Sequence, residues 1–220
     1  MFTRSMKLYR FEYSCFARKA QIVLDLLGLR YDVVEVPFGD RTELVALTNG
    51  YVQVPVLVDD AGEVTVDSRA ICEELLRREG ADRLVPSPLQ GPIWAYADWI
   101  DGPFEDVAFR IAAPGIRRRF ARPADAAMFV FIKERKFGRG CVKEWERNAG
   151  ELIAGARAML APTVQTLGQQ PFIFGTRPTL ADAALYGQCA MLRGADAAMP
   201  AALAPALGEW MERVEAAAHR

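Results

Sequence analysis

Histidine, cysteine and net charge are all scarce in this chain of 220 residues. Its single histidine, His219, argues against a histidine-based zinc site, a Ser-His-Asp triad and a Cys-His catalytic pair. The 27 Lys and Arg residues nearly balance the 28 Asp and Glu residues, so we expect neither nucleic acid nor an anionic membrane as a partner. The four cysteines (Cys15, Cys72, Cys141 and Cys189) have no metal-ligand spacing and are too few for a disulfide scaffold. No metal is therefore expected.

Long hydrophobic runs are missing as well. The longest uncharged stretch, residues 158–176, contains Pro162 and Pro171 and does not have the composition of a membrane span. Charged residues interrupt the first dozen positions, so a secretory signal is not expected. With 51% hydrophobic and 25% charged residues, the composition is typical of a globular protein, and we predict a cytoplasmic location.

The first eighty residues alternate between strand and helix patterns. The predicted strands are 6–11, 31–36, 54–58 and 63–66, and the predicted helices are 16–27, 41–48 and 68–79. Ser14 stands where the N-cap of the first helix belongs, and Gly28 ends that helix. The order βαβαββα predicts an α/β domain over residues 1–80.

A linker rich in proline and glycine covers residues 80–92, and only helical patterns follow it. The predicted helices are 94–100, 124–136, 142–167, 180–192 and 203–218. Thr179 and Asp182 form a capping-box pattern at the start of the fourth of these, which we interpret as a folding signal. Residues 91–220 are therefore predicted to form an all-α domain.

Three segments in this order resemble cytosolic glutathione transferases of the Ser/Cys type. They are Y-S-C-F-A-R-K-A at 13–20, Q-V-P-V-L at 53–57 with V-D-S-R-A-I at 66–71, and P-T-L-A-D-A-A-L at 178–185. The resemblance covers nearly the whole chain. It implies a thioredoxin-like N-terminal domain, a helical C-terminal domain that shapes an electrophile site, glutathione as co-substrate, and a homodimer.

Ser14 is the first candidate for the chemistry. A free thiol has a pKa of about 8.5, and lowering it by two units takes about 2.7 kcal/mol of preference for the anion. A hydroxyl at a helix N-terminus supplies a hydrogen bond to the sulfur, and the helix dipole adds to it. From the residues alone the favoured interpretation of Ser14 is a plain N-cap, and it is the resemblance that implies the catalytic role.

Cys15 is the alternative. A cysteine near a helix N-terminus, with Arg18 and Lys19 close by, could become a thiolate and form a mixed disulfide with glutathione. The protein would then be a thiol-disulfide oxidoreductase. Cys15 could also be a small packed residue, and Tyr9 and Tyr13 stay open as outside candidates because some classes of the family use a tyrosine.

The resemblance also implies a set of glutathione-binding residues. A cis bond between Val54 and Pro55 would turn the backbone of Val54 towards the cysteinyl part of glutathione. Asp67 and Ser68, at a helix start, would hold the γ-glutamyl group, and Gln53 would hold the glycyl end. Without the resemblance these residues are a trans proline at a strand start, a helix cap and an exposed loop residue.

Residues 115–147 are unusually basic: ten Lys and Arg residues face four Asp and Glu residues. This segment could be a solvated helix face and loop, or the surface for an anionic partner. It could also, with Phe129, Phe131, Phe137 and Trp145, border the electrophile pocket and favour an anionic co-substrate. The prediction overall is a transferase that conjugates glutathione to a small electrophile. The oxidoreductase and a non-catalytic binding module with the same fold are the alternatives.

Overall fold

Four short strands form one mixed sheet in the computed structural model, which describes residues 5–219; residues 1–4 and 220 of the two predicted domains lie outside it. The strands are β1 (Met6–Arg10), β2 (Tyr31–Glu35), β3 (Val56–Val58) and β4 (Val64–Val66). Their order across the sheet is β2-β1-β3-β4. β1 pairs parallel with β2 and antiparallel with β3, and β3 pairs antiparallel with β4. The predicted βαβαββα order and the mixed sheet are confirmed.

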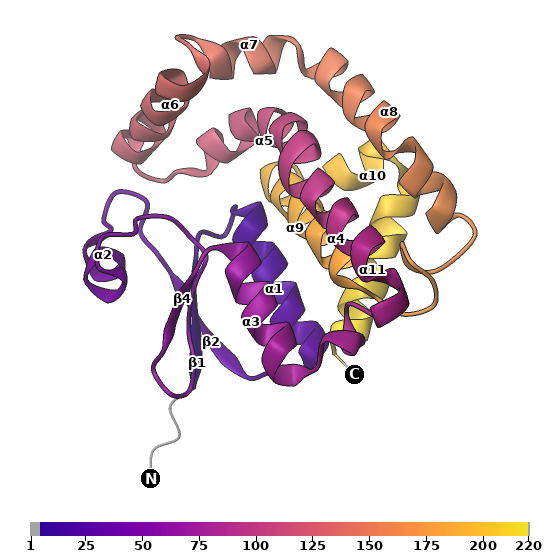
Figure 1. Ribbon diagram of the computed structural model, residues 1–220. Helices are drawn as coiled ribbons and strands as arrows, with labels where there is room; N and C mark the ends of the chain where they lie inside the picture. Colours follow the sequence, from indigo (N-terminus) through magenta and orange to yellow (C-terminus); the bar gives the residue numbers. More distant parts are fainter. Residues whose placement is uncertain (1–4, 220) are drawn as a thin grey trace.

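Helices cover both faces of this sheet, because successive strand residues point to opposite sides. The paired residues Leu8 and Leu57 belong to the main core, with α1 (Cys15–Leu27) and α3 (Ser68–Glu79). The next pair, Tyr9 and Val56, packs with Leu44 of α2 (Thr42–Thr48) in a second cluster. In Figure 1 α1 and α3 accordingly lie on one side of the strands and α2 on the other.

The rest of the described chain is helical. After 3₁₀ turns at Ala81–Arg83 and Ser87–Leu89 come α4 (Gln90–Trp99), a π-helical turn (Ile100–Phe104), α5 (Glu105–Arg119), α6 (Pro123–Phe137), α7 (Cys141–Arg147), α8 (Ala149–Leu167), α9 (Leu180–Ala195), α10 (Met199–Leu203) and α11 (Pro205–Ala218). An isolated β-bridge between Phe172 and Gly175 closes a tight turn before α9. No helix within residues 5–219 combines the length and the apolarity needed to cross a membrane.

The helices of this part differ from the sequence prediction at several places: α5 and α10 were not predicted as separate helices, α4 begins at Gln90 rather than at residue 94, and α9 extends to Ala195. No separate helix was predicted over Glu105–Arg119, which contains Pro114 and Gly115; a proline inside a helix removes a hydrogen bond and normally argues against one. The predicted helix 142–167 is two helices that meet at Asn148. The predicted last helix begins at Pro205 rather than at residue 203, because proline is favoured in the first helical turn.

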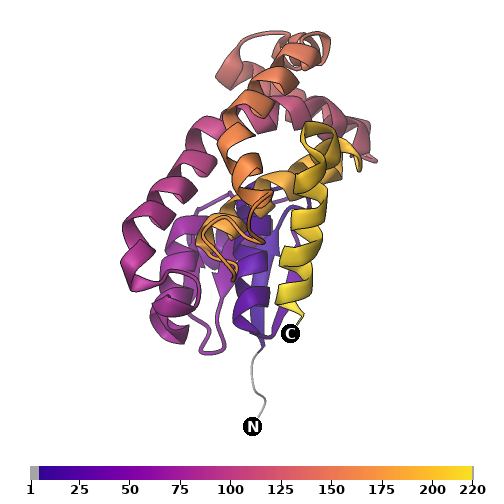
Figure 2. The same cartoon turned by 90° about the vertical axis from the view of Figure 1, so that its right-hand side faces the viewer.

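The helical part contacts the α/β part mainly through α9, which packs against α1. Gly187 makes this close approach possible: a Cβ there would lie 2.4 Å from the carbonyl oxygen of Cys15 and 3.0 Å from the backbone nitrogen of Lys19. These are backbone atoms and cannot rotate away. Figure 2 shows α11 running alongside α1 as well. The first turn of α1 is therefore fixed from the helical side.

Candidate active site

Ser14 is the N-cap of α1, as predicted. Its Oγ accepts a hydrogen bond from the N–H of Ala17 at 3.2 Å, and its own N–H donates to the carbonyl oxygen of Phe11 at 3.0 Å. Because the Oγ acts as an acceptor in this cap, the hydroxyl proton is still free to be donated to another atom. The first N–H groups of the helix have no intrahelical acceptor and point out of the same end. Ser14 is half-buried, so a ligand can reach it.

Cys15, the next residue, lies inside the protein. Only 4% of it is exposed, and it packs under the close approach of Gly187. Burial raises the pKa of its thiol, and the carboxylates of Glu105 and Asp101 raise it further. A reactive cysteine needs the opposite environment, exposed and electropositive.

The two tyrosine candidates differ in position. Tyr9 points to the α2 side of the sheet, where its hydroxyl donates to Glu43 at 3.0 Å, and burial raises its pKa. Tyr13 lies in the β1–α1 loop and stacks on Phe11, with ring centroids 5.4 Å apart. Burial raises the pKa of Tyr13 too, so both phenols stay protonated near neutral pH; Tyr13 lines the cavity that Ser14 also lines, and Tyr9 does not.

The Val54–Pro55 peptide bond is cis, as predicted. β3 begins at Val56 rather than at the predicted residue 54, because proline has no N–H to donate to a neighbouring strand. Gln53 and Val54 line a cavity that Ser14 also lines; Val54 and Pro55 are both buried, and Pro55 does not line the cavity.

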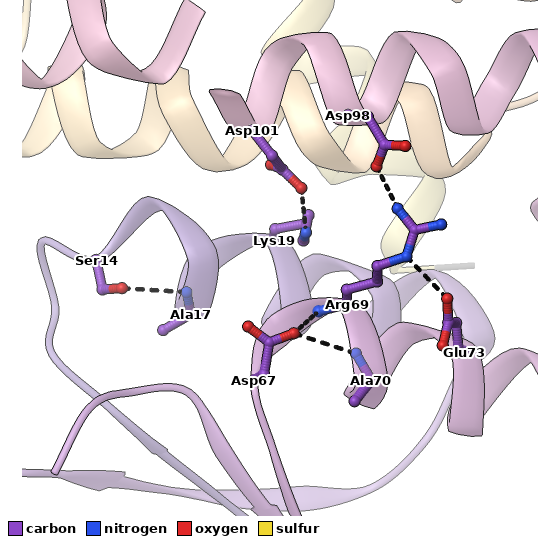
Figure 3. Close-up of polar contacts among 9 residues, drawn as sticks. All are labelled: Ser14, Ala17, Lys19, Asp67, Arg69, Ala70, Glu73, Asp98 and Asp101. Atoms are coloured by element: carbon purple, nitrogen blue, oxygen red, sulfur yellow. Dashed lines mark hydrogen bonds and ion pairs between the residues drawn. The ribbon is translucent and has the colours of Figure 1, made fainter. Parts of the chain in front are cut away.

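Asp67 and Ser68 lie at the start of α3, outside the lining of that cavity. The Asp67 carboxylate caps the helix, accepting from the N–H groups of Arg69 at 2.8 Å and Ala70 at 3.3 Å. Asp67 has φ +74°, a backbone conformation that residues other than glycine rarely adopt and that often occurs at ligand sites. Ser68 is 5% exposed. Figures 1 and 3 show that α1 and α3 begin on the same side of the fold, with Ser14 at one helix start and Asp67 at the other.

The cavity at Ser14 has a volume of about 440 Å³ and opens between the two parts of the chain. On the α/β side it is lined by Phe11, Tyr13, Ser14, Cys15, Phe16, Phe38, Arg41, Val52, Gln53 and Val54. On the helical side it is lined by Glu105, Phe109, Phe129, Ile132, Lys133, Lys136 and Met191. It therefore combines a polar end, at Ser14 and Gln53, with an aromatic wall.

Arg41 in this lining was missed by the sequence analysis. Its guanidinium lies 4.3 Å from the ring centroid of Phe11 and donates to the carbonyl oxygens of Phe38 at 3.0 Å and Val52 at 2.5 Å. Burial lowers its pKa. No sequence pattern distinguishes Arg41 from any other surface arginine, because only the folded β2–α2 loop brings it beside Gln53.

The basic segment 115–147 borders this cavity only in part. Of its ten cations only Lys133 and Lys136 line it, and of its four aromatic candidates only Phe129 does. Phe131 is 54% exposed, and Phe137 and Trp145 border a separate cavity between α5, α7 and α8. The other cations and aromatic residues of the segment do not line this cavity, because they lie on α5, on α7, in the connecting loops or on other faces of α6.

A larger cavity of about 510 Å³ lies on the other side of Phe11 and Phe38. Four arginines line it (Arg10, Arg18, Arg119 and Arg193) together with acidic residues. These arginines already have partners: Arg10 pairs with Glu35 at 2.6 Å, and Arg193 pairs with Glu215 at 2.7 Å. Ser14 does not line it, so we place the candidate site in the smaller cavity.

A buried ion pair lies behind the start of α1. Lys19 of α1, whose side chain is 4% exposed, contacts Asp101 of the π-helical turn, with Nζ 2.5 Å from Oδ2 (Figure 3). Burial raises the pKa of Asp101, and Lys19 opposes that rise. The second oxygen of Asp101 is buried without a hydrogen-bond partner among the described residues. The pair joins the two parts of the chain close to the site.

We expect Lys19→Met to lower the free energy of unfolding by about 3 kcal/mol, because it leaves the Asp101 carboxylate buried without a counter-charge. The double variant Lys19→Met/Asp101→Leu should recover much of that loss, since it removes both charges. Urea denaturation of the two variants measures the difference. A single variant that loses less than about 1 kcal/mol would contradict the interpretation of this pair as a buried contact.

Metal-binding geometry does not occur in the described part of the chain: no group of three His, Cys, Asp or Glu side chains could hold an ion there.

Family models match both parts of the chain. The model of the glutathione S-transferase N-terminal domain matches residues 8–83, and that of the glutathione S-transferase C-terminal domain matches residues 142–213. The chain belongs to the glutathione transferase superfamily, which confirms the resemblance noted in the sequence.

Solved structures share the fold along the whole chain. Glutathione transferase GSTFuA3 from Phanerochaete chrysosporium is 20% identical, with a TM-score of 0.77, over 100% of this chain and 98% of its own. The glutathione S-transferase CsGST83044 of Ceriporiopsis subvermispora, in complex with glutathione, is 17% identical, with a TM-score of 0.78, over 99% of both chains. Glutaredoxin 2 from Salmonella typhimurium, also in complex with glutathione, is 17% identical, with a TM-score of 0.75, over 98% of this chain and 95% of its own. At these identities the likeness establishes the thioredoxin-like fold with its helical second part.

Proposed function

We propose that this protein conjugates glutathione to a small electrophile, with Ser14 stabilising the thiolate. The observation that carries this proposal is the free hydroxyl proton of Ser14 at the start of α1, opening on a cavity that Gln53 and Val54 also line. The sulfur would lie over the helix end, within reach of the hydroxyl and of the first N–H groups of α1.

The chemistry needs no strong base. A charge-assisted hydrogen bond supplies about 1.5–3 kcal/mol, and the helix dipole supplies about 0.3–2 kcal/mol. Together they cover the roughly 2.7 kcal/mol that lowers a thiol pKa by two units. The thiol proton leaves to solvent, the sulfur attacks the electrophile in the aromatic part of the cavity, and the leaving group departs.

The remaining contacts are proposed separately for the three residues of glutathione. The backbone of Val54, before the cis Pro55, pairs with the cysteinyl part, and Asp67 and Ser68 hold the γ-glutamyl end. Gln53 holds the glycyl carboxylate. We add Arg41, because its guanidinium lines the same end of the cavity and its hydrogen bonds go to carbonyl oxygens rather than to a carboxylate.

The oxidoreductase alternative rests on the fold that the chain shares with glutaredoxin 2. It would need Cys15 to reach glutathione as a thiolate, and the burial of Cys15 argues against that. A binding module with the same fold that binds glutathione without turnover is the third candidate.

We further propose that the protein is a cytoplasmic homodimer.

Titration calorimetry with glutathione, followed by assays on an electrophile panel and on mixed disulfides, separates the three candidates. We expect binding and conjugation, and no disulfide reduction. Binding without any turnover would favour the binding module, and reduction that Cys15→Ala abolishes would favour the oxidoreductase.

A further inference from the structure

One face of α6 lines the cavity beside Ser14. Phe129, Ile132, Lys133 and Lys136 have the spacing i, i+3, i+4, i+7, which puts all four on one side of the helix, and all four line the cavity. Pro123–Phe137 also carries Arg135, but that side chain lies over the exposed ring of Phe131, away from the cavity. The lining face therefore has an apolar half followed by two ammonium groups.

The ammonium group of Lys133 lies beside two aromatic rings. Its Nζ lies 4.4 Å from the ring centroid of Phe109, on α5, and 5.4 Å from that of Phe129. Burial lowers the pKa of Lys133, and the neighbouring Lys136 lowers it further. In the described part of the chain neither ammonium forms an ion pair.

The cavity as a whole carries an excess of positive charge. Arg41, Lys133 and Lys136 line it, against the single carboxylate of Glu105. Glu105 interacts with Lys133 and Lys136 without forming an ion pair with either, and one carboxylate does not balance three cations. A half-buried cation that is incompletely balanced is poorly solvated, so an anionic group on a ligand would bind favourably there. Arg41 lies at the end of the cavity where Gln53 is proposed to hold the glycyl carboxylate of glutathione. Lys133 and Lys136 are therefore available to bind the second substrate.

We propose that the second substrate of this site is an aromatic electrophile that carries an anionic group, such as a carboxylate, bound by Lys133 with support from Lys136. This inference rests on the proposed transferase function. Phe109 and Phe129 contact the ring, the ammonium of Lys133 binds the anion at the ring's edge, and the electrophilic carbon is directed towards the sulfur at Ser14.

A pair of probes that differ only in charge tests this specificity: 4-chloro-3,5-dinitrobenzoate and its methyl ester. With either probe the glutathione sulfur forms a bond to the ring carbon that carries chlorine, chloride leaves with the bonding electrons, and the thiol proton goes to solvent. Each kcat/KM is divided by the uncatalysed rate constant of that probe, which removes their different intrinsic reactivities. The corrected kcat/KM for the carboxylate, divided by the corrected kcat/KM for the ester, should exceed one in the unmodified protein.

Lys133→Gln should lower this ratio about tenfold, because it removes a charge-assisted hydrogen bond from a half-buried place. Lys136→Gln should lower it only about two- to threefold, since Lys136 is exposed to solvent and its charge is screened. Glu105→Gln should raise the ratio, because it removes the one opposing carboxylate. Lys133→Arg should keep the preference and so exclude a folding defect as the cause.

Arg135→Gln is the matched control: it makes the same change of charge on the same helix, outside the cavity, and should leave the ratio unchanged. If Lys133→Gln and Arg135→Gln have equal ratios while both probes react, the anion site is refuted and the transferase function stands.

A failure of the proposed function gives a different result. If neither probe reacts, calorimetry with 3,5-dinitrobenzoate and its methyl ester, each lacking the leaving group, still measures the anion site with and without saturating glutathione. A preference for the carboxylate that Lys133→Gln removes supports the site in a non-catalytic protein. Equal affinity for the two compounds overturns it.

Discussion

Replacing Ser14 by alanine should raise the pKa of the thiol of bound glutathione by about one to two units, the equivalent of a lost charge-assisted hydrogen bond of about 1.5–3 kcal/mol. The sign follows from which form the hydroxyl stabilises: it donates to the thiolate, so its loss favours the protonated thiol. Activity at pH 7 should fall and should recover at alkaline pH, where the thiol ionises without help. Thiolate absorbance of bound glutathione against pH measures the shift.

Two controls make this result specific to Ser14. Glutathione affinity measured at acid pH, where the bound thiol is protonated in both proteins, should change little in Ser14→Ala, because Val54, Asp67 and Ser68 are untouched. Cys15→Ala should leave the thiol pKa unchanged, because Cys15 is buried under α9. An unchanged midpoint in Ser14→Ala would remove Ser14 from the mechanism. A parallel loss of activity in Cys15→Ala would give the role to Cys15 instead.

Asp182→Ala should produce the largest loss of stability, a fall in the free energy of unfolding of at least about 3 kcal/mol. Asp182 is 0% exposed and accepts four hydrogen bonds. The donors are the N–H of Ile173 at 3.0 Å, the N–H and Oγ1 of Thr179, both at 2.9 Å, and Nε1 of Trp210 at 3.0 Å. Alanine would leave all four donors buried without an acceptor.

Asp106→Ala is a suitable control for this variant, because Asp106 is half-exposed and forms only an i, i+4 pair with Arg110. It should lose about 0.5 kcal/mol or less. Urea denaturation compares the two variants. If Asp182→Ala unfolds at the same urea concentration as Asp106→Ala, the four hydrogen bonds that Asp182 accepts from the turn before α9 and from Trp210 of α11 do not stabilise the fold as expected.

Much of the α/β part was predictable because its signals are local. The order of strands and helices, the Ser14 cap and the end of α1 before Gly28 each depend on a few neighbouring residues, and all appear as predicted. The capping box at Thr179 is local as well. The break at Asn148 and the helix through Pro114 were not predictable, because tertiary packing overrides local preference there. At Gly115, for example, a Cβ would meet Ala195 of α9 at 2.8 Å.

For the candidate site, the sequence by itself determined the helix start at Ser14, because a cap depends on residues adjacent in the chain. The cis bond before Pro55 was predicted from the resemblance to the family, since adjacent residues alone are equally compatible with a trans bond. The tertiary structure alone decided that Cys15 is buried and that two of ten cations in residues 115–147 reach the cavity. It also brought Arg41 there. The physical reason is that burial and cavity lining depend on tertiary contacts. α9 packs against α1, and α6 contacts the β1–α1 loop through Phe129 and Tyr13, more than a hundred residues apart, whereas Arg41 is placed by nearer contacts of the β2–α2 loop. The residue pattern within one short segment therefore does not predict which side chains become buried or which line the cavity.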